Sequence, residues 1–383
     1  MEKTIDECFF QIQNGANIKQ GDVDGGYPIT RIETTANDKF NRDRMGYAGI
    51  TDLSKYESYV LEDGDLLMSH INSVQYLGRT VLYEKQENET IIHGMNLLRL
   101  KARRDIINPA YARYCFYGHL FRSQVANITK KSVNQASFAV KDLKQLKIDV
   151  PEMNRQNQIV EILNKTNELI GKRQQELDTL DELIKARFVE LFNTGEYPLV
   201  PISELVAGKV QSVKKVFLPE DEIKYIDISS IDNKRNIMTG YTEYILSEAP
   251  SRAQQHIKKG DIVISTVRPN LRNVAMTSFD DNNLVASSGF CVLRASKCLP
   301  EYLLAIVCSD RFTYDMASVV TGANYPAIKD SDVMNYNVVL PPMELQEQFS
   351  DFVKQVDKSK VAVQKALDET QTLFDCLMQE YFG

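Results

Sequence analysis

The chain has few of the residues that build metal centres and disulfide frameworks. Its 383 residues include no tryptophan, four histidines and six cysteines. The cysteines stand at positions 8, 115, 291, 298, 308 and 376, and no two of them have CxxC spacing. A structural zinc site needs clustered Cys or His ligands, so none is expected. Reduced thiols, as in a cytoplasmic protein, are expected instead.

Long hydrophobic runs are also missing. No apolar stretch approaches the roughly 20 residues of a transmembrane helix. The start, MEKTIDECFF, has no basic segment followed by an apolar one, so a signal peptide is not expected. The composition is 43% hydrophobic and 25% charged, which is typical of a globular protein. The length is sufficient for two or three domains, and the expected location is the cytoplasm.

Motifs of catalysis are absent as well. The sequence has no GxG and no GxxxxGK[ST] phosphate loop, so nucleotide hydrolysis is not expected. Asn108-Pro109-Ala110-Tyr111 partly resembles the Asn/Asp-Pro-Pro-Tyr/Phe signature of amino-methyltransferases but lacks its second proline. We interpret the tetrad as a proline in the first turn of a helix with a tyrosine packed behind it. The pattern favours a binding protein over an enzyme.

The strongest positive feature is an internal repeat. Val150–Lys165 reads VPEMNRQNQIVEILNK, and Leu340–Gln355 reads LPPMELQEQFSDFVKQ. With a shift of 190 residues the two segments align without a gap from Leu143/Val333 to Phe192/Phe382. The residues that recur are Pro151, Met153, Gln156, Gln158, Gln174, Leu177, Asp178, Leu183, Glu190 and Phe192. A repeat of this length predicts a duplicated architecture.

Each repeated segment predicts a long amphipathic helix. Apolar residues recur every three or four positions across 159–191 and 349–381, near the 3.5-residue period of a coiled coil. The prolines suit the first turn of each helix, and Asn193-Thr194-Gly195 suits the end of the first. About 42 residues would form a rod of roughly 60 Å. A single helix cannot bury its own apolar stripe, but two helices can bury each other's.

The blocks before the two helices match at short anchors. Gly64-Asp65 with its following strand parallels Gly260-Asp261, and we interpret both aspartates as turn residues. Strands are expected at Tyr225–Ile228 and Gly289–Leu293, and amphipathic helices at 110–128 and 301–318. The histidines at 70, 93, 119 and 256 do not correspond between the blocks. The expected domains are 1–150, a helix at 151–195, 196–340, and a helix at 341–383.

Charge is distributed unevenly along the chain. The net charge of −7 argues mildly against nucleic acid as a partner. However, residues 1–150 carry 20 Lys/Arg against 19 Asp/Glu, and residues 196–340 carry 15 against 17. The two long helical segments hold much of the excess acid, whereas the blocks are nearly neutral and contain basic clusters. Local field, and not total charge, steers a polyanion.

Polar and basic loops in the two blocks form candidate DNA contacts. Arg, Asn and Gln make paired hydrogen bonds to guanine and adenine edges, while Lys and Ser suit phosphates. In the first block the candidates are Arg31, Arg42, Arg44, Asn72, Gln75, Tyr76, Arg79, Lys130, Lys131, Asn134 and Gln135. In the second block they are Ser229, Lys234, Arg235, Arg268, Asn270, Arg272, Asn273, Asn324 and Tyr325. A solvated polar loop is the alternative for any single residue.

The helix opening Leu340–Phe349 resembles that of specificity (S) subunits of type I restriction-modification systems. Val150–Ile159 is a weaker copy, with Glu152 in place of the second proline and Asn157 where an acidic residue is usual. The strand Gly260–Ser265 is similar to part of the target recognition domains of that family. The resemblance covers essentially the whole chain.

The resemblance implies an α+β fold with two similar target recognition globules separated by two long antiparallel coiled-coil helices in pseudo-two-fold relation. It implies a subunit without catalysis that reads a split, asymmetric DNA target. It also implies two modification (methyltransferase) subunits docked on the helices, which would hold the methyl donor S-adenosylmethionine, and recruited restriction (nuclease/translocase) subunits. The half-sites would lie about 34–36 Å apart, by analogy with two-fold readers. A coiled-coil scaffold that never touches DNA and an S-like component of a modification-only defence assembly remain alternatives.

Overall fold

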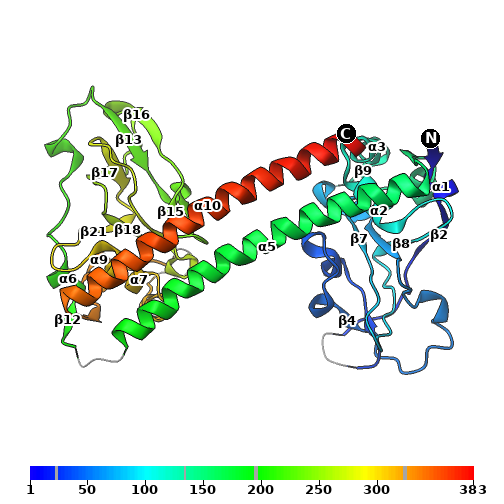
Figure 1. The fold of residues 1–383 in the computed structure, drawn as a ribbon, viewed down its shortest axis with the longest axis horizontal. Helices are drawn as coiled ribbons and strands as arrows, with labels where there is room; N and C mark the ends of the chain where they lie inside the picture. The colour runs from blue at the N-terminus through cyan, green and yellow to red at the C-terminus, as the bar shows by residue number, and fades with distance from the viewer. Residues whose placement is uncertain (22–24, 133–134, 194–196, 322–325) are drawn as a thin grey trace. The chain divides into compact units, whose positions relative to one another are not determined.

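Two helices of 40 residues each are the longest elements of the fold. They are α5, Met153–Phe192, and α10, Met343–Phe382, coloured green and orange to red in Figure 1. The predicted pair of repeated helices is confirmed. The computed structural model describes residues 1–21, 25–132, 135–193, 197–321 and 326–383. Among the helices within these ranges, none is both long and apolar enough to cross a membrane.

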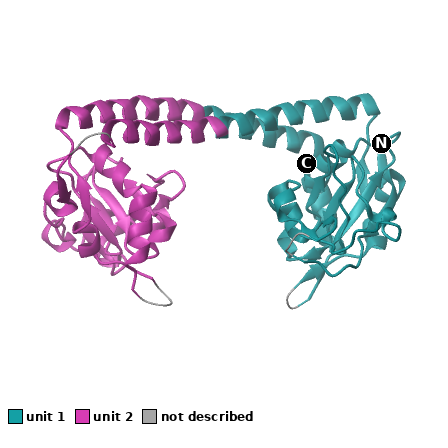
Figure 2. Ribbon diagram, turned by 90° about the horizontal axis from the view of Figure 1, so that it is seen from below, with its two compact units in different colours: residues 1–174, 365–383 teal, residues 175–364 magenta. Residues whose placement is uncertain are grey.

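The chain divides into two compact units, and each contains parts of both long helices. Unit 1 comprises residues 1–174 and 365–383, and unit 2 comprises residues 175–364 (Figure 2). Unit 1 therefore includes the N-terminal part of α5 and the C-terminal part of α10, while unit 2 includes the remainder of each helix. This division passes through the helices, whereas the borders expected at 150, 195 and 340 follow the helix ends.

Within each unit the two helix segments run antiparallel. Successive contacts along α5 meet residues of decreasing number on α10. In unit 1 these contacts are Arg155 with the Tyr381 ring and Arg173 with the carbonyl of Ala366, and in unit 2 they are Asp181 with Lys360 and Arg187 with the Phe352 ring. The predicted apolar seam is only partly buried. Leu163 and Phe349 are fully buried, but Leu169, Leu183 and Leu373 are about half exposed.

The recurring Pro and Gln residues fix the start of each long helix. Gln156 donates a hydrogen bond from Nε2 to the carbonyl of Pro151, at 2.9 Å, and its Oε1 accepts one from the backbone N–H of Asn108. Gln346 makes the equivalent bonds to the carbonyl of Pro341 and the N–H of Leu299. The prolines thus stand two residues before the helices and not in their first turns. A buried amide that joins helix and globule in both units explains why these residues recur.

The tetrad Asn108–Tyr111 has the structural role that the sequence predicted. Asn108 caps helix α2, Pro109–Tyr117, with its side-chain oxygen, and proline occupies the first turn. The hydroxyl of Tyr111 donates to the carbonyl of Asp149, and its ring lies 5.3 Å from that of Phe382. In unit 2, Tyr302 makes the same two contacts, with Val339 and Phe192. This tyrosine anchors each globule to its helix segments.

Both units contain the same three-stranded antiparallel core. In unit 1 it is formed by β7 (Thr80–Leu82), β5 (Leu66–Ser69) and β8 (Leu97–Ala102), and in unit 2 by β19 (Val274–Met276), β18 (Ile262–Ser265) and β21 (Phe290–Leu293). The central strand is fully buried in both.

The Gly-Asp pairs form the turn before each central strand. Gly64 and Gly260 have φ values of 84° and 86°, which favour glycine. The carboxylate of each following aspartate accepts a hydrogen bond from the backbone N–H of the residue three positions earlier. Asp65 lies 3.7 Å from the buried Arg99, and Asp261 forms a two-bond ion pair with Arg294. Both aspartates are therefore turn residues with structural partners.

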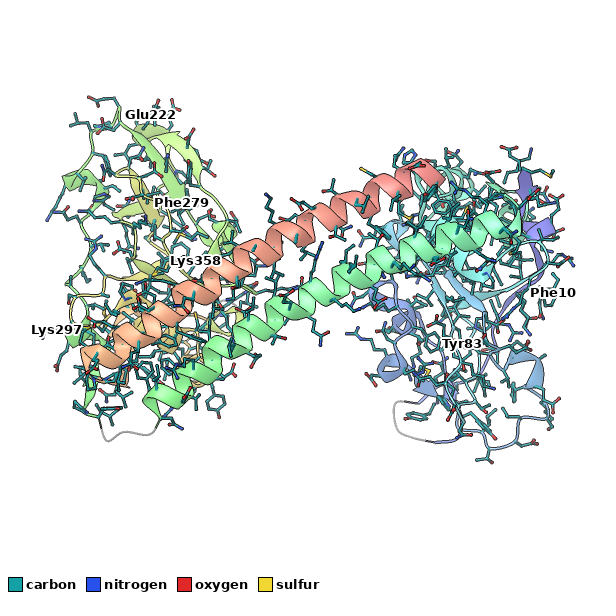
Figure 3. The ribbon with its side chains drawn as sticks, in the orientation of Figure 1. Phe10, Tyr83, Glu222, Phe279, Lys297 and Lys358 are labelled. Atoms are coloured by element: carbon teal, nitrogen blue, oxygen red, sulfur yellow. The ribbon has the colours of Figure 1, made fainter. Side chains whose placement is uncertain are left out.

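The two globules differ around this core. In unit 1, β8 also pairs with β2 (Phe9–Asn14), and Tyr83, labelled in Figure 3, packs in a small cluster with Leu67 and Val81. In unit 2 a second sheet has the order β16-β13-β20-β17. Its strands are Thr242–Ile245, Glu222–Ile226, Leu284–Ser287 and Ala253–His256. This sheet surrounds its own buried residues, among them Ile223 and Val285.

Two helices that the sequence predicted as continuous are interrupted. The segment 110–128 forms α2 and α3 (His119–Ile128), which meet at Gly118. The segment 301–318 forms α7 (Pro300–Val307) and α8 (Asp310–Ser318), with Ser309 capping α8. Apolar periodicity continues through both breaks, so it could not reveal them.

The remaining elements are short. In unit 1 they are β1 (Glu2–Thr4), α1 (Ile5–Cys8), β3 (Pro28–Ile29), β4 (Gly46–Tyr47), α4 (Val140–Leu143) and β11 (Lys147–Asp149). In unit 2 they are β12 (Leu199–Pro201), α6 (Ile202–Leu205), β14 (Ile231–Asp232), β15 (Ile237–Met238), α9 (Asp330–Met334) and β22 (Asn337–Val339). The pairs β1–β11 and β12–β22 join the start of each globule to the strand before its long helix.

Candidate nucleic-acid interface

In unit 1 the structure brings two predicted loop segments together. After β5 the chain forms the short strand β6 (Ile71–Asn72), which pairs with β10 (Ala136–Ser137). The other edge of β10 pairs with β9 (Lys130–Lys131). Both lysines are exposed. The loop that follows the central strand and the segment that precedes the long helix therefore share one small sheet.

Unit 2 has the same arrangement in reduced form. Val267, in the loop after β18, forms a β-bridge with Ala327, and Ala327 also bridges to Thr321. The bridged residues correspond to Ile71, Ser137 and Lys130 of unit 1. Loops that are far apart in sequence are thus joined in the same way in both units, although their side chains differ.

The loop of unit 2, residues 268–273, is held in an unusual conformation. Arg268 and Arg272 both have left-handed backbone angles, with φ of 50° and 54°. The guanidinium of Arg272 is paired with Asp310 at 2.6 Å, whereas Arg268 and Asn270 are exposed. Arg268 has no ion pair with any residue in the described ranges. Asn273 is buried, which leaves Arg268 and Asn270 as the side chains best placed to meet a ligand.

The predicted third segment of unit 2 supports this loop. The Nδ2 group of Asn236 donates to the carbonyls of Arg272 and Val274, at 3.2 and 3.1 Å. Asn233 donates to the carbonyl of Leu271 at 2.8 Å. Neither asparagine stood among the sequence-based candidates, and no pattern in the sequence distinguishes them from other turn residues.

The candidates in that third segment lie beside the asparagines. Lys234 and Arg235 are exposed, and both backbone N–H groups donate to the Asp232 carboxylate. Ser229 is exposed, but its hydroxyl donates to Asp227 at 2.6 Å. Arg235 also lies 3.9 Å from the Asp232 carboxylate, so Lys234 is the exposed cation of this segment without an ion pair to another described residue.

The third segment of unit 1 has a different role. Arg42 makes two hydrogen bonds to Glu89, at 2.8 and 2.7 Å, and lies over the rings of Phe40 and Tyr83. This pairing with Arg42 lowers the pKa of Glu89 to about 2. Arg31 donates to Gln20 and to the carbonyl of Gly21. Both arginines bind other parts of their own globule.

Arg44, the last candidate of that segment, is exposed. It takes part in none of the ion pairs formed by residues in the described parts of the chain. Of the three arginines grouped together from the sequence, only Arg44 presents its charge to solvent in this way.

The loop of unit 1 contains an arginine that is also occupied. Arg79 forms an ion pair with Asp38 at 2.8 Å, and its guanidinium lies 4.7 Å from the centre of the Tyr76 ring. Asn72 is partly buried, with its Oδ1 accepting the N–H of Ser73 and its Nδ2 donating to Ser69. Gln75 and Tyr76 are exposed. Asp38 is a supporting residue that sequence reasoning missed.

Three candidates cannot be placed. Asn134, Asn324 and Tyr325 lie outside the described residues. Gln135, next to the first of these, is exposed, and its carbonyl accepts hydrogen bonds from the N–H and hydroxyl of Ser132.

Two stretches of sequence that contribute to these loops contain no acidic residues. Residues 106–141 include no Asp or Glu and five Lys or Arg, and residues 262–279 include no Asp or Glu and two Arg. In a chain with a net charge of −7, this segregation makes both stretches locally basic in sequence, although Asp310 pairs with Arg272 from outside its stretch. Runs free of acidic residues are a signal that could have located the interface from sequence alone.

The histidines of unit 1 are not poised for catalysis. Burial lowers the pKa of His93 to about 3 and that of His70 to about 4, so both are neutral near pH 7. Across the described ranges, no three His, Cys, Asp or Glu side chains gather closely enough to hold a metal ion. The described parts of these loops offer exposed hydrogen-bond donors and cations to a ligand.

Comparison with known proteins agrees with this arrangement. Residues 2–179 and 195–370 each match the family described as type I restriction modification DNA specificity domain. A Methanocaldococcus jannaschii protein described as a putative type I restriction enzyme MjaX specificity subunit is 28% identical over 388 residues, covering 94% of this chain and 89% of that protein. The EcoKI specificity subunit of Escherichia coli K12 is 24% identical over 151 residues, covering 39% of this chain and 32% of its own length.

A solved structure has the same fold along the whole chain. The S subunit of a type I restriction-modification system from M. genitalium superposes with a TM-score of 0.61 at 13% identity, covering 100% of this chain and 96% of that one. The two matched regions correspond to the two globules, each with helix segments. The chain therefore belongs to the type I restriction-modification DNA specificity family, as a non-catalytic specificity subunit that recognises DNA sequence.

Proposed function

We propose that the chain reads a DNA target split into two different half-sites, one for each unit. One observation carries the proposal. Both units join the loop after the central strand to the segment before the long helix through the same β-bridges, yet the side chains on these loops differ. A common scaffold with different contact residues is what two readers of different sequences need.

In this proposal each unit combines base readout with phosphate contacts. Arg268 and Asn270 of unit 2 are exposed donors that can meet base edges in the major groove. Lys130 and Lys131 of unit 1, like Lys234 and Arg235 of unit 2, are exposed cations suited to phosphates. Each phosphate contact would make binding weaker as salt rises.

The long helices would serve as the spacer between the half-sites. They would also carry two modification (methyltransferase) subunits, to which restriction (nuclease/translocase) subunits are recruited. Leu169, Val361 and Leu373 are exposed apolar residues on the helices that a docked subunit would cover. The methyl donor S-adenosylmethionine would be bound by the modification subunits and not by this chain. A second solved structure, which superposes with a TM-score of 0.55 at 14% identity, is described as showing complex assembly of a type I restriction-modification system.

The spacer can be tested by lengthening both helices equally. Inserting four residues after Gly171 and four after Val361 keeps the repeat in register and adds about 6 Å of helix. Methylation sequencing of cells that produce the variant with its modification subunit should show a longer unread gap, by roughly two base pairs at 3.4 Å each, between unchanged half-sites. An unchanged gap would contradict the spacer role. The matched control has the insertion after Gly171 only, which shifts the helices out of register and should impair methylation of any target.

A DNA-independent scaffold is the competing function. It predicts that the modification subunit still co-purifies with the chain, but that methylation shows no bipartite pattern. An S-like component of a modification-only assembly predicts the bipartite pattern without any co-purifying nuclease chain. The same strains thus distinguish all three.

A further inference from the structure

The loop of unit 1 presents apolar side chains to solvent within a single turn. Val74 is 51% exposed, Ile71 38% and Tyr76 36%. Isolated exposed apolar residues are common on protein surfaces, but three within six residues form a local patch. Gln75, between two of them, is also exposed.

Several contacts brace the loop that contains this patch. The loop closes through a hydrogen bond from the N–H of Gly78 to the carbonyl of Ser69, at 2.8 Å. Arg122 donates to the carbonyl of Leu77 at 2.8 Å, and Arg79 stacks on Tyr76. The loop backbone is therefore braced at both ends while Val74 and Ile71 are exposed. An exposed apolar patch suits a surface that is buried on binding.

The small sheet beside the patch carries two exposed lysines, while Asp38 pairs with Arg79 next to the Tyr76 ring. Lys130 and Lys131 lie on β9, in the same three-stranded sheet as Ile71. The segment that supplies them, residues 106–141, contains no Asp or Glu. An apolar patch bordered by lysines is complementary to a base-pair edge bordered by phosphates. An acidic rim would instead have favoured a basic protein partner.

The polar groups of the loop narrow the choice of base. Arg79, the loop's arginine, is held by Asp38, and the amide of Asn72 is already bonded within the loop. The side chain of Gln75 has no hydrogen-bond partner among the described residues. Gln pairs with the N6 and N7 groups of adenine, and apolar side chains contact the thymine methyl group. In the major groove, the adenine N6 and N7 groups and the thymine methyl group lie on the same A·T base pair.

We propose that unit 1 recognises A·T pairs in its half-site, with Val74 and Ile71 against thymine C5-methyl groups and Gln75 on adenine. This inference rests on the proposed DNA-reading function and specifies the base that one unit reads. It differs from the guanine contacts expected of the exposed Arg268 in unit 2.

The test removes single methyl groups from DNA. The probe is a duplex that carries the target found by methylation sequencing, with each thymine replaced in turn by deoxyuridine. The complex of this chain with its modification subunit should bind roughly four-fold more weakly at one or more positions of the unit 1 half-site, as expected for one buried methyl group. Val74→Ala should remove most of the difference between thymine and deoxyuridine at one of those positions.

A matched control is Val216→Ala, which shortens an exposed valine of unit 2 outside the proposed contact and docking residues and should leave the thymine preference unchanged. Arg268→Ala identifies the unit 2 half-site, because its effect should be confined to that half-site. A unit 1 half-site without thymine, or equal affinity for thymine and deoxyuridine at every position, would overturn the inference while leaving the proposed function intact. Absence of any bipartite target would instead refute the proposed function.

Discussion

The loops that follow the central strands of units 1 and 2 occupy equivalent places but present different chemical groups to solvent. In unit 1 the arginine is neutralised by Asp38, and apolar groups face solvent. In unit 2 an arginine with left-handed backbone angles is exposed, and two asparagines support the loop behind it. Duplication preserved the bridges that position the loops, while the groups available for contact diverged.

The difference teaches that an arginine in a loop is not evidence of a DNA contact by itself. Arg42 and Arg79 bind acidic groups of their own unit, and Arg272 is paired with Asp310. Each is therefore committed in the unbound structure, and using it for DNA would require breaking an ion pair. Arg268 is exposed and requires no such exchange.

Arg268→Ala should give the largest effect on recognition. Loss of a bidentate contact to guanine removes about 1–3 kcal/mol, or roughly 5- to 150-fold in affinity, at one position of the unit 2 half-site. Binding to duplexes with substituted half-sites measures this loss. Arg272→Ala should cost less, since that guanidinium is held by Asp310, and the double variant should impair only one half-site. Normal methylation of all targets by the double variant would show that this loop does not read bases.

Arg42→Ala should affect stability and not specificity. It leaves the partly buried Glu89 without its strongest partner, at a cost of about 2 kcal/mol in the free energy of unfolding. Arg42 depresses the folded-state pKa of Glu89 to about 2, so this contribution is present above pH 4.5 and is lost as the pH falls toward 2. Chemical unfolding at pH 7 and pH 3 measures both effects.

Arg44→Ala is the control for Arg42→Ala, because Arg44 is exposed and should leave stability nearly unchanged. If Arg42→Ala instead weakens DNA binding without loss of stability, then Arg42 contacts DNA and the distinction between the two arginines is wrong.

Asn236→Gly should produce the smallest effect. Glycine accepts the φ of 54° at this position but removes two hydrogen bonds that hold the arginine loop. Because the loop is then less well positioned, the binding free energy should weaken by about 1 kcal/mol, or roughly five-fold in affinity, at the unit 2 half-site alone. Competition binding with half-site variants measures it. The control, Asn88→Gly, makes the same change at a φ of 60° in unit 1 and should not alter DNA recognition. If both changes weaken binding equally, Asn236 does not position the arginine loop.

Much of the fold was predictable because the sequence contains an internal repeat. The matched register between Pro151, Gln156 and Phe192 and their counterparts reflects contacts made in both units, so the two long helices could be predicted. The breaks at Gly118 and Ser309 could not, since apolar periodicity continues through them. The added sheet of unit 2 has no counterpart among the described residues of unit 1, and therefore no repeat revealed it.

The candidate interface was predictable as a set of segments but not as a set of side chains. The loops after the Gly-Asp strands could be chosen because they recur, and the structure brings them to the segments before the helices. Which arginines are available depends on pairs such as Arg79 with Asp38, which are 41 residues apart. Single-sequence patterns do not encode such pairings.

The most direct test of the account is the methylation map of cells that produce this chain with its modification subunit, compared with the map for Arg268→Ala. Two different half-sites separated by a constant gap are predicted for the unaltered chain. The variant should relax one half-site and leave the other half-site and the gap unchanged. A palindromic or continuous target, or a variant that alters both half-sites equally, would contradict two independent readers in one chain.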